Sequence, residues 1–207
     1  MNLFRLALSY YEFKKTESEK ERFLIFYDLS KAFDSCSRTI LKDKLKEVFY
    51  YSTQNNDKKL GKELFNGFLN FMDNAKLNFG KEQIKLNKGV NQGDSCSPLA
   101  FNLIMDSLKE ITEVYGLYAE DSYQEEKTEQ EAIYSIKNTK EWAIKNEFEI
   151  NYRKSNVLKW IKRKTRNLEE PLKIFEEIRQ VESVKYLGIT IDEKMTLDNH
   201  KKQISKN

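Results

Sequence analysis

Hydrophobic and polar positions along the chain predict both helices and strands. Residues 3–14 place Leu3, Ala7, Leu8 and Tyr11 at helical spacing, which predicts a first, amphipathic helix. Residues 23–29, FLIFYDL, hold six apolar or aromatic side chains and one acid, a pattern typical of a strand buried on both faces. The acid, Asp28, requires a partner or a cation, because an ionised carboxylate beside a buried strand is otherwise costly.

The next segment predicts helices and one β-hairpin. Ser35 or Ser37 can cap a helix, whose expected inward side chains are Ile40, Leu41, Leu45 and Val48. A second helix is predicted at residues 59–72, and residues 75–89 alternate as a hairpin does. Pro98 fits the first turn of a broadly apolar helix, which is expected to be buried through Leu99, Phe101, Leu103, Ile104, Met105 and Leu108.

Residues 115–124, YGLYAEDSYQ, predict a tight hairpin that displays two adjacent carboxylates, Glu120 and Asp121. Taken alone, these acids are most simply a solvated turn. A surface helix with Ile133, Ile136 and Trp142 turned inward follows, and the tail indicates several short strands. If the strands bring Asp28 to the acidic turn, three carboxylates meet at one end of a sheet. Divalent cations bound between them would relieve their repulsion, and two such ions held by carboxylates are a common arrangement in enzymes that transfer phosphoryl groups.

Composition places the chain among globular α/β or α+β proteins. Its 207 residues suffice for one domain, and the content of 13 Phe, 11 Tyr, 7 Gly and 2 Pro argues against a disordered or low-complexity chain. Cys36 and Cys96 are isolated, and the one histidine, His200, has no metal-ligand spacing, so neither a disulfide framework nor a zinc site is expected. A reducing compartment fits this usage, and no apolar run approaches the roughly 20 residues of a membrane span.

The first eleven residues contain Arg5 and no acid, a faint likeness to an organelle-targeting (mitochondrial) helix. They lack the repeated Arg and Ser of such segments, so an ordinary amphipathic helix is the simpler interpretation.

A basic stretch at residues 150–168 stands out because the formal net charge of the whole chain is only +3. It contains no acid, and Tyr152 and Trp160 are interleaved with the bases. This pattern fits a path for an RNA phosphate backbone with stacking aromatics, and it fits a solvated hairpin with a lysine-rich turn equally well. Its bases are Arg153, Lys154, Lys159, Lys162, Arg163, Lys164 and Arg166.

Five segments in sequence order resemble successive motifs of the reverse transcriptase palm, closest to the non-LTR retrotransposon and group II intron types. They are FYDLSKAFDSCSR, NKGVNQGDSCSPLAFNLIMDSL, LYAEDSYQ, NYRKSNVL and VKYLGITID. The resemblance implies an α+β fold, a palm-like sheet with packed helices over residues 23–192. Residues 1–22 would form an N-terminal helix and connection, and residues 193–207 a polar tail.

The resemblance also implies the residues of a two-metal polymerase site. Asp28 matches a metal ligand, and Glu120 and Asp121 match the acidic hairpin, so these three carboxylates would hold Mg²⁺ in an active RNA-directed DNA polymerase. Lys154 matches a lysine with a proposed proton-donating role near the leaving pyrophosphate. Asp34 matches a second acid of its motif, although capping a helix is the commoner use of such a residue.

Nucleotide and primer contacts follow from the same resemblance. Phe33 matches the steric gate at the sugar 2′ position, and Gln92 and Gly93 match the turn beside the incoming nucleotide and template. The hairpin that grips the primer end is matched by Tyr186, Leu187 and Gly188.

The chain departs from the family at the acidic hairpin, where Glu120 stands at the position of a metal-ligating Asp. The added methylene shifts the carboxylate by roughly 1 Å, and misplacement on that scale costs about 10²-fold in rate, since Mg²⁺ demands near-ideal geometry. Fingers, expected before residue 23, and a thumb, expected after His200, have no matching segments in the sequence.

Three functional hypotheses remain open. The first is a degenerate, catalytically inactive palm that serves as an RNA-binding or structural subunit of a larger assembly such as a ribonucleoprotein. The second is a split or fragmentary polymerase subunit, with fingers and thumb supplied by another chain. The third is a purely structural subunit docked through exposed apolar patches. A protein partner is expected under each.

Overall fold

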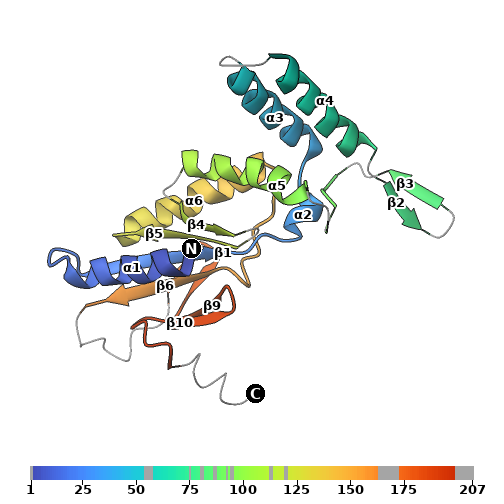
Figure 1. The fold of residues 1–207 in the computed structure, drawn as a ribbon. Helices are drawn as coiled ribbons and strands as arrows, with labels where there is room; N and C mark the ends of the chain where they lie inside the picture. Colours follow the sequence, from blue (N-terminus) through green and yellow to red (C-terminus); the bar gives the residue numbers. More distant parts are fainter. Residues whose placement is uncertain are drawn as a thin grey trace. The chain divides into compact units, whose positions relative to one another are not determined.

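The computed structural model describes residues 2–53, 58–74, 76–79, 82–85, 88–91, 93, 96–111, 114–118, 121–162 and 173–198. The chain forms two compact units (Figure 1). Unit 1 comprises Met1–Ser30, Lys109–Trp142 and Glu149–Asn207, and unit 2 comprises Lys31–Leu108 and Ala143–Phe148. Unit 2 is built from two segments that interrupt unit 1 at two places along the chain.

A six-stranded sheet forms the centre of unit 1, in the strand order β4-β5-β1-β6-β8-β7. The central strand β1 pairs antiparallel with β5 and β6, and β6 pairs parallel with β8. Residues 23–27 of β1 are at most 4% exposed, which confirms the strand predicted to be buried on both faces. The strands are β1 (Glu21–Tyr27), β4 (Val114–Tyr118), β5 (Asp121–Glu126), β6 (Asn156–Ile161), β7 (Ile174–Phe175) and β8 (Ile178–Val181).

Each face of this sheet is covered by a helix (Figure 1). Helix α1 (Asn2–Lys15) packs on one face together with the hairpin of β9 (Ser183–Tyr186) and β10 (Ile189–Asp192). Helix α6 (Glu129–Lys145) covers the other face through its part in unit 1, with Ile136 and Trp142 buried as predicted and Ile133 half-buried. The core beneath α1 consists of Leu6, Phe13, Leu24, Phe26, Tyr123, Leu158, Trp160, Val184, Tyr186 and Ile191.

The predicted first helix is present as α1, but of the four apolar positions that indicated it only Leu3 packs against the core, where it is partly buried. Leu6, Ser9 and Phe13 are its buried residues, whereas Ala7 is exposed and Leu8 and Tyr11 are 46% and 55% exposed. The helix carries two apolar stripes, and periodicity alone does not choose between them. The stripe that faces the sheet is the one whose Phe13 ring packs against Trp160, with ring centroids 5.9 Å apart.

Unit 2 contains the helices and hairpin predicted between residues 32 and 108. Leu41 and Leu45 are buried as predicted, but Val48, one turn further along the same stripe, is 46% exposed. Leu99 is 60% exposed, because the buried face of its helix follows residues 100, 101, 104, 105 and 108 instead. The elements are α2 (Ala32–Ser35), α3 (Arg38–Thr53), α4 (Lys58–Asp73), β2 (Lys76–Phe79), β3 (Glu82–Lys85), α5 (Ser97–Met105) and the 3₁₀ turn η1 (Asp106–Glu110), which continues into unit 1.

Two glycines should respond oppositely to substitution by alanine. A Cβ at Gly116 of β4 would overlap the buried Tyr123 ring, so Gly116→Ala should lower the free energy of unfolding by about 1–3 kcal/mol. Gly67 lies inside α4 with open space around it, so Gly67→Ala should raise that energy by about 0.5–1 kcal/mol. Urea denaturation of both variants gives the sign of each change in the free energy of unfolding. Changes of the same sign and size in the two variants would contradict the packing described for Gly116 and Gly67.

Candidate active site

A pocket of about 260 Å³ in unit 1 lies where several strand ends meet. It gathers residues that are far apart in the sequence, including Asp28, Asp121 and Lys154. The complete lining is Phe26, Tyr27, Asp28, Asp121, Lys154, Asn156, Val184, Lys185 and Tyr186. Candidates predicted from four separate motifs therefore line one cavity.

The register of β1 and β5 brings the two aspartates to this pocket. Tyr27 pairs with Ser122 in this antiparallel pair. Asp28, which follows Tyr27, and Asp121, which precedes Ser122, therefore lie at the same end of the two strands. The main chain of Asp28 is held on both sides, because its N–H donates to Ser155 Oγ at 3.1 Å and its carbonyl accepts from the Asn151 N–H at 2.8 Å. The peptide that carries the Asp28 carboxylate is thus fixed by hydrogen bonds.

Lys154 reaches Asp28 from the turn that precedes β6. The Lys154 N–H donates to the Asn151 carbonyl at 3.0 Å, and the Asn156 side-chain amide donates to the Lys154 carbonyl at 2.6 Å. The turn places Lys154 Nζ 3.7 Å from Asp28 Oδ2, with the lysine side chain 69% exposed and the aspartate side chain 23% exposed. Water screens such a pair, which contributes at most about 1 kcal/mol, so the lysine can exchange Asp28 for another anion at little cost.

The predicted primer-grip residues form the turn of the β9–β10 hairpin. Tyr186 pairs with Ile189, and the two residues between them, Leu187 and Gly188, have φ angles of 48° and 80°, as a type I′ turn requires. Tyr186 packs against Phe26 and Tyr123 with ring centroids 5.3 and 5.5 Å apart. Burial raises the pKa of Tyr186 to about 12, so this phenol stays neutral and acts as a packing residue at the pocket wall.

Lys185 is a pocket residue that sequence reasoning missed. It is exposed on β9 between the buried Val184 and Tyr186, and it lines the same cavity as Asp28 and Asp121. The alternation of buried and exposed positions in a strand could have identified it. With Lys154, it adds a second ammonium group to a pocket that holds two carboxylates.

A buried polar network lies behind β5. The side-chain oxygen of Gln124 accepts from the Tyr27 hydroxyl at 3.1 Å and from the Ser135 hydroxyl at 2.7 Å, and its amide donates to the Thr139 hydroxyl at 3.0 Å. Burial raises the pKa of Tyr27 above its ordinary value, so its hydroxyl remains a donor. This network ties β1 and β5 to α6 next to the two aspartates.

Phe33 and Gly93 belong to unit 2. The Phe33 ring stacks on the Phe101 ring, with 4.8 Å between the ring centroids. The main-chain carbonyl of Phe33 accepts a hydrogen bond from the Val90 N–H at 2.9 Å. Gly93 is exposed with a φ of 85°. Asp34 lies within α2. The backbone of Gly89 passes so close to Asp34 that an added Cβ would come within 2.8 Å of the Asp34 carbonyl oxygen, so position 89 requires a glycine.

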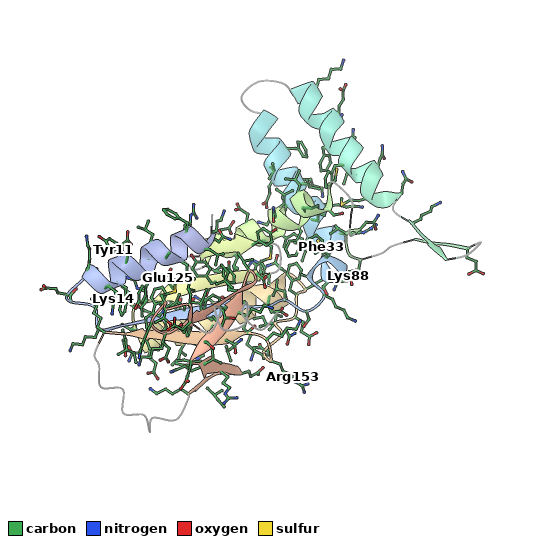
Figure 2. All side chains as sticks on the ribbon, turned by 60° about the horizontal axis from the view of Figure 1, so that its bottom comes forward. Tyr11, Lys14, Phe33, Lys88, Glu125 and Arg153 are labelled. Carbon is green, nitrogen blue, oxygen red and sulfur yellow. The ribbon has the colours of Figure 1, made fainter. Side chains whose placement is uncertain are left out.

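Other candidates differ in how accessible they are. Arg153 is exposed (Figure 2). Lys159 is only 14% exposed and forms an ion pair with Glu21 at 2.7 Å, and the Lys162 ammonium contacts the Thr16 carbonyl and lies 5.0 Å from the Phe13 ring centroid. Five predicted site residues lie outside the described residues: Gln92, Glu120, Arg163, Lys164 and Arg166.

The donor set of the pocket suits Mg²⁺ in kind, since Asp28 and Asp121 supply carboxylate oxygens, the ligands that this ion prefers. Within the described ranges, no group of three or more His, Cys, Asp or Glu side chains is close enough to hold a metal. The same part of the chain contains no helix that is long and apolar enough to cross a membrane.

The sequence model of the family described as reverse transcriptase (RNA-dependent DNA polymerase) matches residues 4–191. The chain belongs to the reverse transcriptase family. No curated protein matches it significantly. The match confirms the family inferred from the five motifs and agrees with the pocket, where four of those motifs meet.

Two solved structures show a similar fold. An apo telomerase from Candida tropicalis, truncated from its C-terminal domain, aligns with a TM-score of 0.62 at 15% identity, covering 95% of this chain and 38% of the telomerase. A foamy viral protease-reverse transcriptase in complex with an RNA/DNA hybrid aligns with a TM-score of 0.51 at 16% identity, covering 88% and 18%. The likeness confirms the predicted α+β class, and the chain spans less than two fifths of either relative.

The Gln124 network should be needed for stability at this site of the reverse transcriptase fold. Gln124→Met keeps the length of the side chain but removes a partner from three buried hydroxyls, so the free energy of unfolding should fall by about 2–4 kcal/mol. The matched control is Gln130→Met on the exposed surface of α6, which should change it by less than about 0.5 kcal/mol. Equal urea midpoints for the two variants would rule out the network as a stabilising element.

Proposed function

We propose that this chain is a reverse-transcriptase-type palm that binds RNA within a larger assembly and whose nucleotidyl transfer is impaired at Glu120. The observation that carries the proposal is the pocket that joins Asp28, Asp121 and Lys154, in a chain whose acidic hairpin has Glu where the family has Asp. The framework for binding nucleic acid is retained, and the altered ligand affects the chemical step alone.

Bound Mg²⁺ would supply charge neutralisation at the reacting phosphate, and its protein ligands would be Asp28 and Asp121 together with the carboxylate at position 120 that the family resemblance implies. The residues of the chain have roles that do not depend on that ion. Lys154 and Lys185 present ammonium groups to a phosphate at the pocket, and the buried Tyr186 supports the turn at Leu187 and Gly188. A palm of this kind would hold an RNA or primer end even when transfer is slow.

RNA is the favoured ligand on two grounds. The family is that of RNA-dependent DNA polymerases, and the foamy viral relative is a complex with an RNA/DNA hybrid. Arg153 and Lys154 are both exposed and stand near the start of the basic stretch, and Lys154 reaches the Asp28 carboxylate at the end of β1. These positions supply cations for a phosphate backbone next to the pocket.

A second candidate function is an RNA-directed DNA polymerase subunit that works with a chain supplying fingers and thumb. It is favoured by the register that brings Asp28 and Asp121 to one pocket, an arrangement that a purely structural subunit does not require. The two candidates differ in one quantity, which is the rate of Mg²⁺-dependent nucleotide addition.

Primer extension on an RNA template with Mg²⁺ separates these candidates. The impaired palm should show little or no extension, and Glu120→Asp should raise the rate by about 10²-fold, because the shorter acid restores the ligand position. Asp28→Asn in the Glu120→Asp background should remove the gain. Efficient extension by the unaltered chain would contradict impairment and favour the second candidate, whereas extension that survives Asp28→Asn would exclude this pocket as its source.

RNA binding is tested by its dependence on salt. If the basic stretch follows the phosphate backbone, the logarithm of the affinity for single-stranded RNA should fall linearly with the logarithm of the salt concentration. Changing Lys162, Arg163 and Lys164 together to Gln should reduce the magnitude of this slope by about 2. A matched control changes Lys42, Lys44 and Lys46 of α3 to Gln. Equal slopes for both triple variants would remove this stretch from the RNA interface.

A further inference from the structure

A short segment of unit 2, residues 88–90, is held by hydrogen bonds although it belongs to no helix or strand. We call it the Gly89 segment. The Gly89 N–H donates to the Cys36 carbonyl at 2.8 Å, and the Val90 N–H donates to the Phe33 carbonyl at 2.9 Å. Gly89 and Val90 are both buried, and buried backbone groups need such partners because an unpaired one is costly.

A buried arginine holds the carbonyl side of the Gly89 segment. The Arg38 Nε–H donates to the Gly89 carbonyl at 2.9 Å, and Arg38 Nη1 donates to the Met72 carbonyl at 2.6 Å. Met72 lies near the end of α4, and Gly89 lies just beyond the β2–β3 hairpin. One guanidinium therefore joins the two flanks of that hairpin. Only arginine offers several charged donors in one rigid, planar group, which this double contact uses.

Glu147, just beyond the end of α6, holds the other end of the Gly89 segment. Its Oε1 atom accepts from the Ser37 hydroxyl at 3.1 Å, and its Oε2 atom lies 3.2 Å from Lys88 Nζ. Lys88 is labelled in Figure 2. The Lys88 ammonium and the Ser37 hydroxyl lower the pKa of Glu147, so the carboxylate is ionised at neutral pH and keeps both contacts.

The backbone at Glu147 has a conformation that favours glycine. Its φ is 60°, in the left-handed region where a Cβ is disfavoured and where helices commonly end on glycine. Main-chain atoms complete this helix end, because the Phe148 N–H donates to the Ala143 carbonyl at 2.8 Å. A glutamate is therefore not needed for the helix to end here, and its side chain instead makes the contacts with Ser37 and Lys88.

We infer that Arg38 and Glu147 form a clamp on the Gly89 segment that positions the turn at Gly93. Residues 91–96 separate the clamped Val90 from the start of α5, so a fixed Val90 and a fixed helix restrict where Gly93 can lie. Both are positioning residues that act through the backbone. The inference rests on the proposed function, because the family resemblance is what assigns Gly93 to the template and the incoming nucleotide.

Hydrogen exchange in the full ¹⁵N-labelled chain tests the clamp without nucleic acid. Glu147→Gly should raise the exchange rates of the Gly89 and Val90 amides about fivefold, through the loss of one exposed ion pair and one hydrogen bond. The urea midpoint should change little, because glycine suits the backbone at position 147 and offsets the lost contacts.

The matched control for this variant is Glu176→Gly. Glu176 is an exposed glutamate with a φ of 55° in the turn between β7 and β8, so the same side chain is removed from the same backbone conformation. Exchange at Gly89 and Val90 should stay unaltered in this control. Equal exchange rates in the two glycine variants would overturn the role of Glu147.

Arg38→Lys tests the other half of the clamp. Lysine keeps the charge but has one nitrogen, so it cannot bond the Gly89 and Met72 carbonyls as the guanidinium does. Exchange at Gly89 should rise by about tenfold or more, and the urea midpoint should fall, because a buried carbonyl loses its donor. Unchanged exchange in a folded Arg38→Lys chain would overturn the role of Arg38. If this variant does not fold, Glu147→Gly still decides whether the segment is clamped.

Affinity for an RNA template annealed to a DNA primer separates this inference from the proposed function. Glu147→Gly should bind the hybrid about threefold more weakly than Glu176→Gly, which removes the same charge, because the turn at Gly93 is no longer preorganised. If the unaltered chain does not bind the hybrid, the proposed function fails and the exchange rates alone decide the clamp. If the two variants bind equally despite faster exchange in Glu147→Gly, the positioning role is overturned and the proposed function stands.

Discussion

The burial of β1 on both faces and its pairing on both edges determine the rest of unit 1. Its apolar residues exclude water above and below the sheet, while β5 and β6 satisfy its backbone groups on either side. Such a strand has one acceptable register, because a slip of one residue would turn every side chain to the opposite face. The positions of Asp28, Asp121 and Lys154 follow from that register, since each lies at or just beyond the end of a paired segment.

Adjacent residues of β5 attach the helices on opposite faces of this sheet. Gln124 points toward α6 and bonds Ser135 and Thr139, whereas Glu125 points toward α1 and bonds Ser9 and Arg22. Apolar packing is tolerant of small shifts, but buried hydrogen bonds have narrow geometric limits. These two polar groups therefore fix the helices at defined positions where hydrophobic contact alone would allow sliding.

The sequence predicted the positions of helices and strands better than it predicted which of their sides face the core. Residues 23–27 and the hairpin that contains Asp121 were identified because their apolar density and turn composition have few alternatives. The orientation of α1 was not predictable, because Leu6 and Phe13 on one stripe compete with Leu8 and Tyr11 on another, and only the shape of the sheet decides between them. Lys185 was missed for a related reason, since an exposed strand lysine is noticed only when the pocket it borders is known.

The fold and the chemistry of this site place different demands on the acidic hairpin. The backbone of β5 is held by pairing with β1 and β4, and its side chains Tyr123, Gln124 and Glu125 are held by ring packing and the two polar clusters. Those interactions are set by the backbone register of residues 121–126 and by side chains that follow Asp121. A metal ligand, in contrast, must have the right length to within about 1 Å. Under the proposed function, a change from Asp to Glu at position 120 would therefore slow transfer without loss of the palm, because the interactions described for β5 do not depend on the length of that side chain.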